Sequence, residues 1–258
     1  MAIDTDTAQE AFRKADGMGY RRFLQEMHGQ VAFDWYMEVG CRSGRSFAPV
    51  RSATIAVDPH FSINADVVGE KPALHIFQQT SDAFFESRFL QKNGIRLGLS
   101  FLDGMHLIEF LLRDFIATEA ASAPDGITTI HDCCPFSHEM TTRDLDNLPG
   151  GAWTGDVWKI LPILQTYRDD LKIDVLDCRR TGLVVVSNLD PKSTVLRERY
   201  DDILTVYQRL SLQAFGVDRL FDSFTYRSAR DEARAGFPLF QQAARAEPVT
   251  GRAAKVTP

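Results

Sequence analysis

The stretch Trp35-Tyr36-Met37-Glu38-Val39-Gly40-Cys41-Arg42-Ser43-Gly44-Arg45-Ser46 decides the fold of this chain. An apolar, aromatic run contains the acid Glu38 near its end, and a short turn bracketed by Gly40 and Gly44 follows. Glycines let the chain turn sharply and let backbone N–H groups approach a ligand closely. Glu38 therefore lies at the predicted carboxyl end of a strand, where open α/β sheets bind their ligands.

A second apolar run, Thr54-Ile55-Ala56-Val57, ends in Asp58. An acid at the tip of a second strand is placed to bond ribose hydroxyls, as in dinucleotide-binding folds. The glycine spacing separates two classes of ligand. A dinucleotide fingerprint reads G-x-G-x-x-G, with a helix N-terminus under a pyrophosphate. The turn in this chain reads G-x-x-x-G behind an acid.

Apolar runs alternate with helical patterns along the chain. We predict strands at roughly 32–39, 53–58, 74–78, 96–102 and 127–130, and an antiparallel hairpin from 172–176 and 182–187. Helices are predicted over 7–29 with an interruption, briefly over 47–50, after Thr80, over 106–118, from 156, and from Pro191 with Asp190 as its cap. This alternation predicts a parallel sheet with right-handed crossovers.

With its terminal hairpin, this order of elements resembles the class I S-adenosylmethionine (SAM) methyltransferases over roughly residues 30–190. Their motif I, E/D-x-G-x-x-x-G, matches Glu38 to Gly44. The resemblance implies an α/β fold, a Rossmann-like sheet that is mostly parallel with an antiparallel terminal hairpin and helices on both faces. It also implies SAM as cofactor, bound by Glu38, Gly40, Cys41, Arg42, Ser43, Gly44, Asp58, Ser81, Asp82 and Asp103, with Ser81 and Asp82 near the adenine.

A second stretch, Leu102-Asp103-Gly104-Met105-His106-Leu107-Ile108-Glu109 with Asp114, resembles the I-D-G-x-H-x-Y-E…D pattern of one methyltransferase subfamily. Members of that subfamily often act on sugars, glycosylated natural products or cell-envelope glycans. The chain departs from the pattern at Ile108, where a tyrosine is usual. We expect Asp103 at a strand tip facing the cleft, His106 one turn into the next helix, and Asp114 on a solvated helix face.

The third stretch is Ile130-His131-Asp132-Cys133-Cys134-Pro135. In metal-dependent relatives this strand tip carries paired acids, or an acid and an amide, that bind magnesium together with an acid on the neighbouring strand. The resemblance thus makes Asp103, His131 and Asp132 candidate ligands of a divalent metal, magnesium or manganese. Magnesium prefers oxygen ligands, whereas a histidine suits manganese, iron or zinc better. His131 is alternatively a catalytic base, or a residue that orients Asp132.

Methyl transfer from SAM to a hydroxyl requires a positioned oxygen and the removal of its proton. A histidine, with an ordinary pKa of about 6.5, is a natural base at neutral pH, and a divalent metal achieves the same by lowering the pKa of the hydroxyl. The catalytic candidates are His106, His131 and Asp103. The resemblance therefore implies SAM-dependent O-methylation of a hydroxyl on a small or glycosylated molecule, with a small-molecule or glycan acceptor as the partner.

Two alternatives stay open: a non-catalytic protein with the methyltransferase fold, and another nucleotide-binding Rossmann enzyme. The intact Glu38, Gly40, Gly44 and Asp58 argue against the first. The missing G-x-G-x-x-G argues against the second.

Composition limits the remaining classes. The 258 residues are 44% hydrophobic with a formal net charge of -6, which suits one α/β domain with additions. The chain has no block of Lys and Arg residues that would indicate a nucleic-acid partner. It also has no apolar run long enough to predict a membrane-spanning helix. The four cysteines form no C-x-x-C pair, and the N-terminus lacks a signal-peptide pattern, so we expect reduced thiols and a cytoplasmic location.

We expect four parts along the chain. Residues 1–30 are predicted as an N-terminal helical cap, 31–190 as the SAM-binding domain, 191–242 as a helical extension, and 243–258 as a disordered tail. The terminal helices offer apolar stripes, which also suit a homo-oligomer contact.

Overall fold

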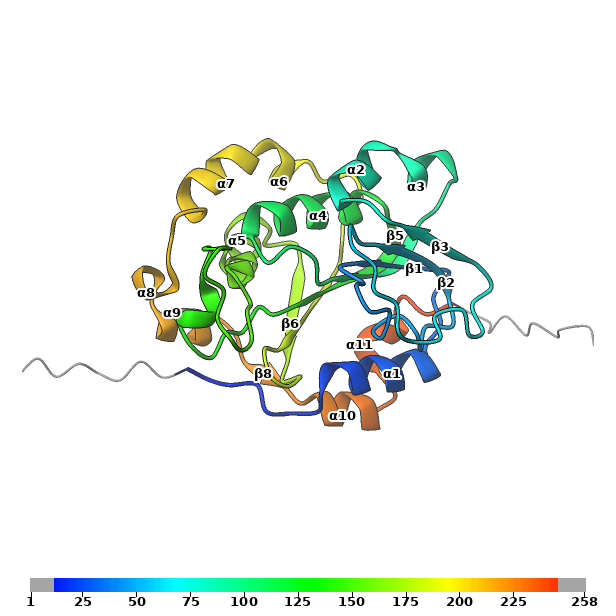
Figure 1. Ribbon diagram of the computed structural model, residues 1–258, viewed down its shortest axis with the longest axis horizontal. Coiled ribbons are helices and arrows are strands. Elements are labelled where there is room, and N and C mark those ends of the chain that lie inside the picture. The colour runs from blue at the N-terminus through cyan, green and yellow to red at the C-terminus, as the bar shows by residue number, and fades with distance from the viewer. Residues whose placement is uncertain (1–11, 246–258) are drawn as a thin grey trace, which may run out of the picture.

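The computed structural model describes residues 12–245, which are built around one eight-stranded sheet with the order β3-β2-β1-β4-β5-β7-β6-β8 (Figure 1). Five neighbouring strands pair with one another in parallel: β1 (Trp35–Val39), β2 (Ala53–Val57), β3 (Leu74–Phe77), β4 (Leu97–Leu102) and β5 (Ser122–His131). β7 (Leu183–Ser187) runs antiparallel to β5 and to β6 (Lys172–Leu176), and β8 (Tyr226–Arg227) pairs with β6. This order confirms the predicted Rossmann-like fold and its hairpin.

Helices cover both faces of the sheet (Figure 1). On one face α4 (Ile108–Ala120) and α5 (Ile160–Tyr167) pack over an apolar core that includes Phe115 and Trp158. On the other, α1 (Tyr20–Gln30), α10 (Ala229–Arg234) and α11 (Pro238–Gln241) enclose a second core around Phe23 and Phe237. Because both faces are covered, β2, β4 and β7 are buried at every position, as near-continuous apolar strands require.

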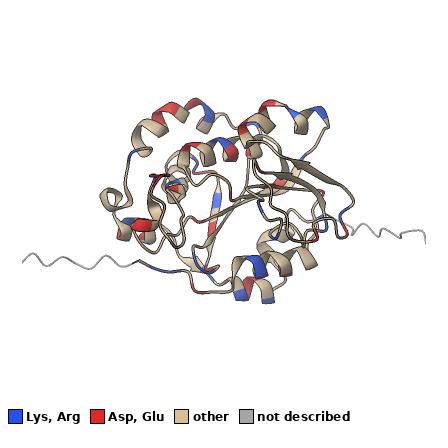
Figure 2. Ribbon diagram, in the orientation of Figure 1, with Lys and Arg blue, Asp and Glu red and all other residues tan. Residues whose placement is uncertain are grey.

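The remaining elements are short. They comprise α2 (Ser81–Glu86), α3 (Phe89–Lys92), α6 (Val195–Glu198), α7 (Tyr200–Tyr207), α8 (Leu212–Phe215), α9 (Val217–Asp222) and the 3-10 turns η1 (Glu139–Thr141) and η2 (Val157–Lys159). Acidic and basic residues are interspersed along the outer helices (Figure 2). Within residues 12–245, no helix combines the length and apolar character that crossing a membrane demands.

Strand register determines where the site lies. Val39 of β1 pairs with Val57 of β2 and with Leu102 of β4, and Leu102 pairs in turn with Ile130 of β5. The residues that follow these four positions therefore lie together at one carboxyl edge of the sheet. They are Gly40, Asp58, Asp103 and His131.

The N-terminal segment differs from the prediction. Within the described part of the predicted helix 7–29, only Tyr20–Gln30 is helical, and residues 12–19 are not. Gly17 N donates to the Asp177 carbonyl at 2.7 Å and the Met18 carbonyl accepts from Arg179 N at 2.9 Å, so this segment is bonded to the connection that follows β6 instead. The parts of the predicted cap and helix before residue 12 lie outside the described residues.

Several element boundaries also differ. The predicted helix over 47–50 is only a turn, with Ala48 N bonded to the Gly44 carbonyl at 2.8 Å. β5 begins at Ser122, earlier than predicted, and its register against β4 shifts between Leu97 and Leu99. His106 precedes α4, which begins at Ile108. The prediction that His106 lies one turn into this helix is therefore wrong.

The C-terminal region holds two further differences. The helix predicted from Pro191 begins only at Val195, because Asp190 Oδ1 accepts from Lys192 N at 2.9 Å and closes a turn first. In the predicted tail 243–258, Arg245 N donates to the Ala32 carbonyl at 2.8 Å, so the chain is bonded to the domain up to that residue. Residues 246–258 lie outside the described part of the chain.

Candidate active site

The glycines of the first turn are required by the packing of the strand tips. Gly40 has a φ of +89°, and a Cβ there would lie 2.0 Å from the Asp103 carbonyl oxygen. Gly44 has a φ of +79°, and its Cβ would lie 2.5 Å from Val67 Cγ1. A side chain at either position would therefore meet the protein itself, in a backbone region that favours glycine.

Glu38 is fully buried at the end of β1. Its carboxylate accepts a hydrogen bond from the Tyr36 hydroxyl at 2.5 Å and another from Ser46 Oγ. Burial raises the pKa of Glu38 to about 8, and the two hydrogen bonds only partly oppose this rise. At neutral pH most of the Glu38 population is therefore protonated, and a cation placed nearby would favour its ionised form.

Asp58 is held by two backbone groups. Oδ2 accepts from Arg42 N at 2.8 Å, and Oδ1 accepts from His60 N at 2.7 Å. The carboxylate thus links the glycine turn to the loop after β2. Of the other predicted cofactor residues in this turn, Arg42 is exposed and Ser43 half-buried, whereas Cys41 is buried with its Sγ 3.3 Å from the Glu38 carbonyl. Cys41 therefore faces the protein beneath the turn.

The start of α2 holds the two residues predicted near adenine. Asp82 is engaged in a two-pronged ion pair with Arg113, in which both N···O distances are 2.7 Å, and this hydrogen bonding lowers its pKa. Ser81 forms a side-chain hydrogen bond with Asp114. The structure thus gives each predicted residue a partner from α4.

Asp114 was expected on a solvated face, and that expectation is wrong. Its side chain is buried, with 3% exposure, and its Oδ1 has no hydrogen-bond partner among the described residues. Burial raises its pKa to about 7. Glu109 pairs with Arg143, which lies in the long loop between β5 and η2, at an N···O distance of 2.6 Å.

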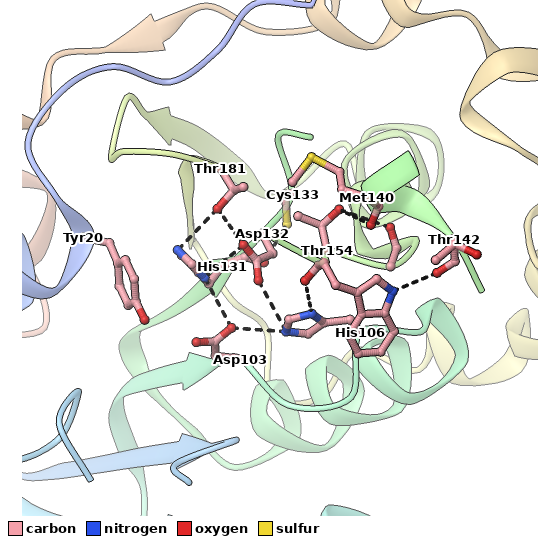
Figure 3. Close-up of polar contacts among 12 residues, drawn as sticks. Tyr20, Asp103, His106, His131, Asp132, Cys133, Met140, Thr142, Thr154 and Thr181 are labelled. Carbon is pink, nitrogen blue, oxygen red and sulfur yellow. Dashed lines mark hydrogen bonds and ion pairs between the residues drawn. The ribbon is translucent and has the colours of Figure 1, made fainter. Parts of the chain in front are cut away.

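Four side chains meet beyond the tips of β4 and β5, and we call them the strand-tip cluster: Asp103, His106, His131 and Asp132 (Figure 3). His131 Nδ1 lies 3.3 Å from Asp103 Oδ1 and 3.3 Å from Asp132 Oδ1. His106 Nε2 lies 3.5 Å from Asp103 Oδ1 and 3.4 Å from Asp132 Oδ2. The fold thus brings together all four residues that the second and third sequence motifs singled out.

Charges in the cluster balance one another. Burial alone would lower the pKa of His131, but the carboxylates of Asp132 and Asp103 outweigh it and raise the value to about 10. Burial alone would raise the pKa of Asp103, but His131 and His106 outweigh it and lower the value. With no cation bound, His131 therefore carries a proton at neutral pH and is not ready to accept another.

His106 is oriented by the end of the long loop. Its Nδ1 lies 2.9 Å from the Trp153 carbonyl oxygen, which can only accept, so Nδ1 carries the proton and Nε2 faces the carboxylates. The His106 carbonyl accepts from Asp156 N at 3.1 Å. A Cβ on Gly155 would lie 1.7 Å from that carbonyl oxygen, so the glycine permits this close approach.

Sequence reasoning missed two residues that contact the cluster. The ring of Tyr20 lies against the His131 ring, with centroids 3.9 Å apart. Thr181 Oγ1 donates to Asp132 Oδ1 at 2.6 Å. Tyr20 falls within the helix predicted over 7–29, and Thr181 falls between the two predicted hairpin strands. No motif marks either residue, because each is brought to the site by chain far from both strand tips.

The long loop between β5 and η2 lies beside the strand-tip cluster, next to His106. In this loop, Trp153 donates its Nε1–H to the Thr142 carbonyl at 2.9 Å, and its ring centroid lies 5.0 Å from that of His106. Trp158, in η2, is buried in the core. A cavity of about 630 Å³ lies between this loop, η2 and α8, lined by Arg143, Lys159 and Leu212 among others, and no member of the strand-tip cluster lines it.

The sequence matches no protein-family model and no curated protein. Among solved structures, the cofactor-bound protein Rv0187 from MTB aligns with a TM-score of 0.51 at 10% identity, over 66% of this chain and 80% of that one. The O-methyltransferase TomG from Streptomyces achromogenes, in complex with SAM, aligns with a TM-score of 0.48 at 12% identity, over 65% and 78%. MycE from the mycinamycin pathway, in complex with Mg, SAH and mycinamycin VI, aligns with a TM-score of 0.41 at 17% identity, over 66% and 49%. The chain therefore shares a fold with Rv0187 and spans about half the length of MycE.

Proposed function

We propose that this protein is a SAM-dependent methyltransferase that methylates a hydroxyl on a small or glycosylated molecule. One observation carries the proposal: the acid-tipped glycine turn, Asp58 and the strand-tip cluster share one carboxyl edge of the sheet. Open α/β sheets bind ligands at that edge. A cofactor held over the tips of β1 and β2 would then present its methyl group toward the tips of β4 and β5.

The proposed cofactor site is the turn Glu38–Gly44 together with Asp58. Asp58 already accepts two backbone hydrogen bonds, so its carboxylate is fixed before a ribose arrives. Glu38 would serve the cationic amino-acid portion of SAM, and the backbone of Arg42 and Ser43 would line the approach. Ser81 stays a candidate near the adenine. Asp82, paired with Arg113, is more suited to holding α2 in place.

Asp103, His131 and Asp132 are proposed to hold a divalent cation, with one atom from each residue lying within 4.8 Å of the others. His131 Nδ1 lies 3.3 Å from each carboxylate oxygen, close to the separation of about 3 Å between neighbouring ligands at about 2.1 Å from an octahedral ion. One nitrogen with two oxygens fits manganese better than magnesium. When bound, the ion would lower the pKa of the acceptor hydroxyl.

His106 is the proposed proton acceptor. Its Nδ1–H is committed to the Trp153 carbonyl, so Nε2 is the atom that would receive a proton. Nε2 lies 3.4 Å from Asp132 Oδ2 and 3.5 Å from Asp103 Oδ1, and these carboxylates would stabilise the resulting imidazolium. Trp153 would flank the acceptor, and the long loop would exclude water from it.

Calorimetry with SAM and with NAD tests the cofactor. We expect SAM to bind and NAD not to bind. Binding of NAD alone would favour the other Rossmann enzyme, and binding of neither would favour a non-catalytic protein.

Methyl transfer in EDTA, followed by add-back of magnesium, manganese and zinc, tests the metal. We expect activity to be lost and then restored, best by manganese. Full activity in EDTA, with Asp103→Asn active and His106→Ala inactive, would reject the metal and leave a histidine base.

We further propose a small-molecule or glycan acceptor, a homo-oligomer formed through the terminal helices, and a cytoplasmic location. The four free cysteines, all buried, suit a reducing compartment. We also propose a SAM-binding domain over 31–190 and a helical extension over 191–242. The helices of this extension contribute to the same two cores as the sheet.

A further inference from the structure

Thr181 lies in the connection between β6 and β7, with 4% exposure. Its backbone is bonded to the segment that follows Asp132, because Cys134 N donates to the Thr181 carbonyl at 2.9 Å. The next residue is Gly182, where a Cβ would lie 2.6 Å from Cys134 Sγ. The connection is therefore packed closely against the tip of β5, and the Thr181 hydroxyl is held beside the strand-tip cluster (Figure 3).

The single hydroxyl proton of Thr181 is already used. Oγ1 donates it to Asp132 Oδ1 at 2.6 Å, a short bond to a charged acceptor. The same Oγ1 lies 3.5 Å from His131 Nε2 and can offer that atom only lone pairs. The lone pairs of Oγ1 attract an N–H group but repel the lone pair of an unprotonated nitrogen. The neighbouring Thr181 oxygen therefore favours the form of His131 that carries its hydrogen on Nε2.

The other ring nitrogen, Nδ1, is then the one that faces Asp103 and Asp132. Rotation of the ring is restricted on its face by Tyr20, with centroids 3.9 Å apart, and by Phe101 at 6.3 Å. Asp132 itself has a φ of +64°, an unusual backbone conformation for a residue other than glycine. Asp132 is the member of the strand-tip cluster with a positive φ, and the hydrogen bond from Thr181 fixes its side chain.

We propose that Thr181 is a positioning residue of the cation site: it keeps the hydrogen of His131 on Nε2, which leaves Nδ1 as the ligand atom, and it holds Asp132 Oδ1 beside that nitrogen. The proposal rests on the proposed metal site. It assigns a role to the β6–β7 connection, which supplies no ligand of its own but would orient two ligands from β5. Removing such a partner of metal ligands typically costs about 10–100-fold in metal affinity.

The test compares Thr181→Val with Thr181→Ser in the full-length protein. Binding of Mn²⁺ is followed by the loss of the electron paramagnetic resonance signal of the free ion, without SAM or acceptor. We expect Thr181→Val to weaken binding by about 10–100-fold and Thr181→Ser, which keeps the hydroxyl, to remain within about 3-fold of wild type. A purely steric role would not give this rescue, because serine lacks the methyl group that valine keeps.

Thr54→Val is the matched control. Thr54 is also buried, and its hydroxyl donates to the Ser52 carbonyl at 2.9 Å in β2, away from the cluster. Its Mn²⁺ affinity should equal that of wild type. If Thr181→Val melts at the wild-type temperature and binds Mn²⁺ equally well, Thr181 has no positioning role. If wild type itself fails to bind any divalent ion, the metal site is rejected, and the role of Thr181 with it, while SAM binding and methyl transfer in EDTA are judged separately.

Discussion

At the scale of single residues, the acids along the carboxyl edge have different environments. Asp58 is bonded to two backbone N–H groups, Asp103 faces two histidines, and Glu38 and Asp114 are buried with raised pKa values. Each environment gives a carboxyl group a different chemical role, so each predicts a different response to mutation or to pH.

Replacing Asp58 tests the ribose assignment. We expect Asp58→Ala to weaken SAM binding by roughly 10–150-fold, the equivalent of about 1.5–3 kcal/mol for lost charge-assisted hydrogen bonds. Calorimetry with SAM measures the change, with circular dichroism as the check on folding. Wild-type affinity in a folded Asp58→Ala protein would contradict the assignment.

Glu38 predicts a pH dependence of SAM binding. Its pKa of about 8 means that most Glu38 side chains are neutral at neutral pH, while a cationic ligand favours the carboxylate. Binding should therefore release a proton, and SAM affinity should rise between about pH 6 and about pH 8. Calorimetry in buffers of different ionisation enthalpy measures the released proton. The Glu38→Gln variant should lose this pH dependence. If the SAM affinity of the wild-type protein does not change with pH, no cationic group of the ligand lies beside Glu38.

Asp114 predicts a pH dependence of stability. Its pKa is about 7 in the folded protein, against an ordinary value of 3.8, so the folded state binds the proton more tightly. The free energy of unfolding should therefore fall as pH rises between these two values, by up to about 1.4 kcal/mol per pH unit from this group. Asp114→Asn removes the effect, and urea unfolding should show it more stable than wild type at about pH 8 but not at about pH 4. Equal differences at both pH values would refute this explanation.

At the scale of elements, the contact between the tips of β1 and β4 joins the glycine turn (Gly40–Gly44) to the strand-tip cluster. Gly40 makes this contact possible, because a Cβ there would lie 2.0 Å from the Asp103 carbonyl oxygen and 2.6 Å from Gly104 N. Both neighbours are backbone atoms, which cannot move aside as a flexible side chain can. The turn and the cluster are thus placed by one shared packing requirement.

We expect Gly40→Ala to impair stability and SAM binding together. Positive φ and overpacking each cost about 1–3 kcal/mol, and a chain of this size loses about 2–4 °C of melting temperature per kcal/mol. Differential scanning fluorimetry and calorimetry with SAM measure the two effects. Gly150→Ala is the control, because its Cβ would meet nothing within 4 Å. A Gly40→Ala protein with the melting temperature of Gly150→Ala would show that the strand tips can separate without cost.

At the scale of the whole molecule, the site is assembled from distant parts of the chain. Tyr20 comes from the start of α1, two cluster residues come from the β5 tip, and Thr181 comes from the connection before β7. Gly17 is bonded to Asp177 in the same connection, so the N-terminal segment and the hairpin support one another beside the cluster. A ligand bound there should therefore stabilise the fold as a unit.

We expect manganese to raise the melting temperature. An ion present at 100 times its dissociation constant adds about 2.7 kcal/mol to the free energy of unfolding, which corresponds to roughly 5–10 °C here. Fluorimetry with Mn²⁺ and with EDTA measures the difference. The double variant Asp103→Asn, Asp132→Asn should lose the shift, and an equal shift in that variant would place the ion elsewhere.

Much of the fold was predictable because the signals are local. Apolar runs that end in acids gave the first strands and their tips, and the spacing of 172–176 and 182–187 gave the hairpin, which the register confirms. Asp103, His106, His131 and Asp132 were identified as candidates because each directly follows a predicted strand or lies a few residues beyond it. In a parallel sheet such positions necessarily share one edge.

Tertiary structure alone decided the rest. The sequence by itself determined the alternation of strands and helices along the chain and the residues at the strand tips, because a run of apolar residues encodes its own conformation and burial. It could not show that Gly17 and Met18 would bond to the connection after β6, that Asp114 would be buried, or that Tyr20 and Thr181 would contact His131. These contacts join residues distant in sequence, and their partners are selected by how helices and connections close over the sheet. No local period or motif records that choice, so only the packed molecule reveals it.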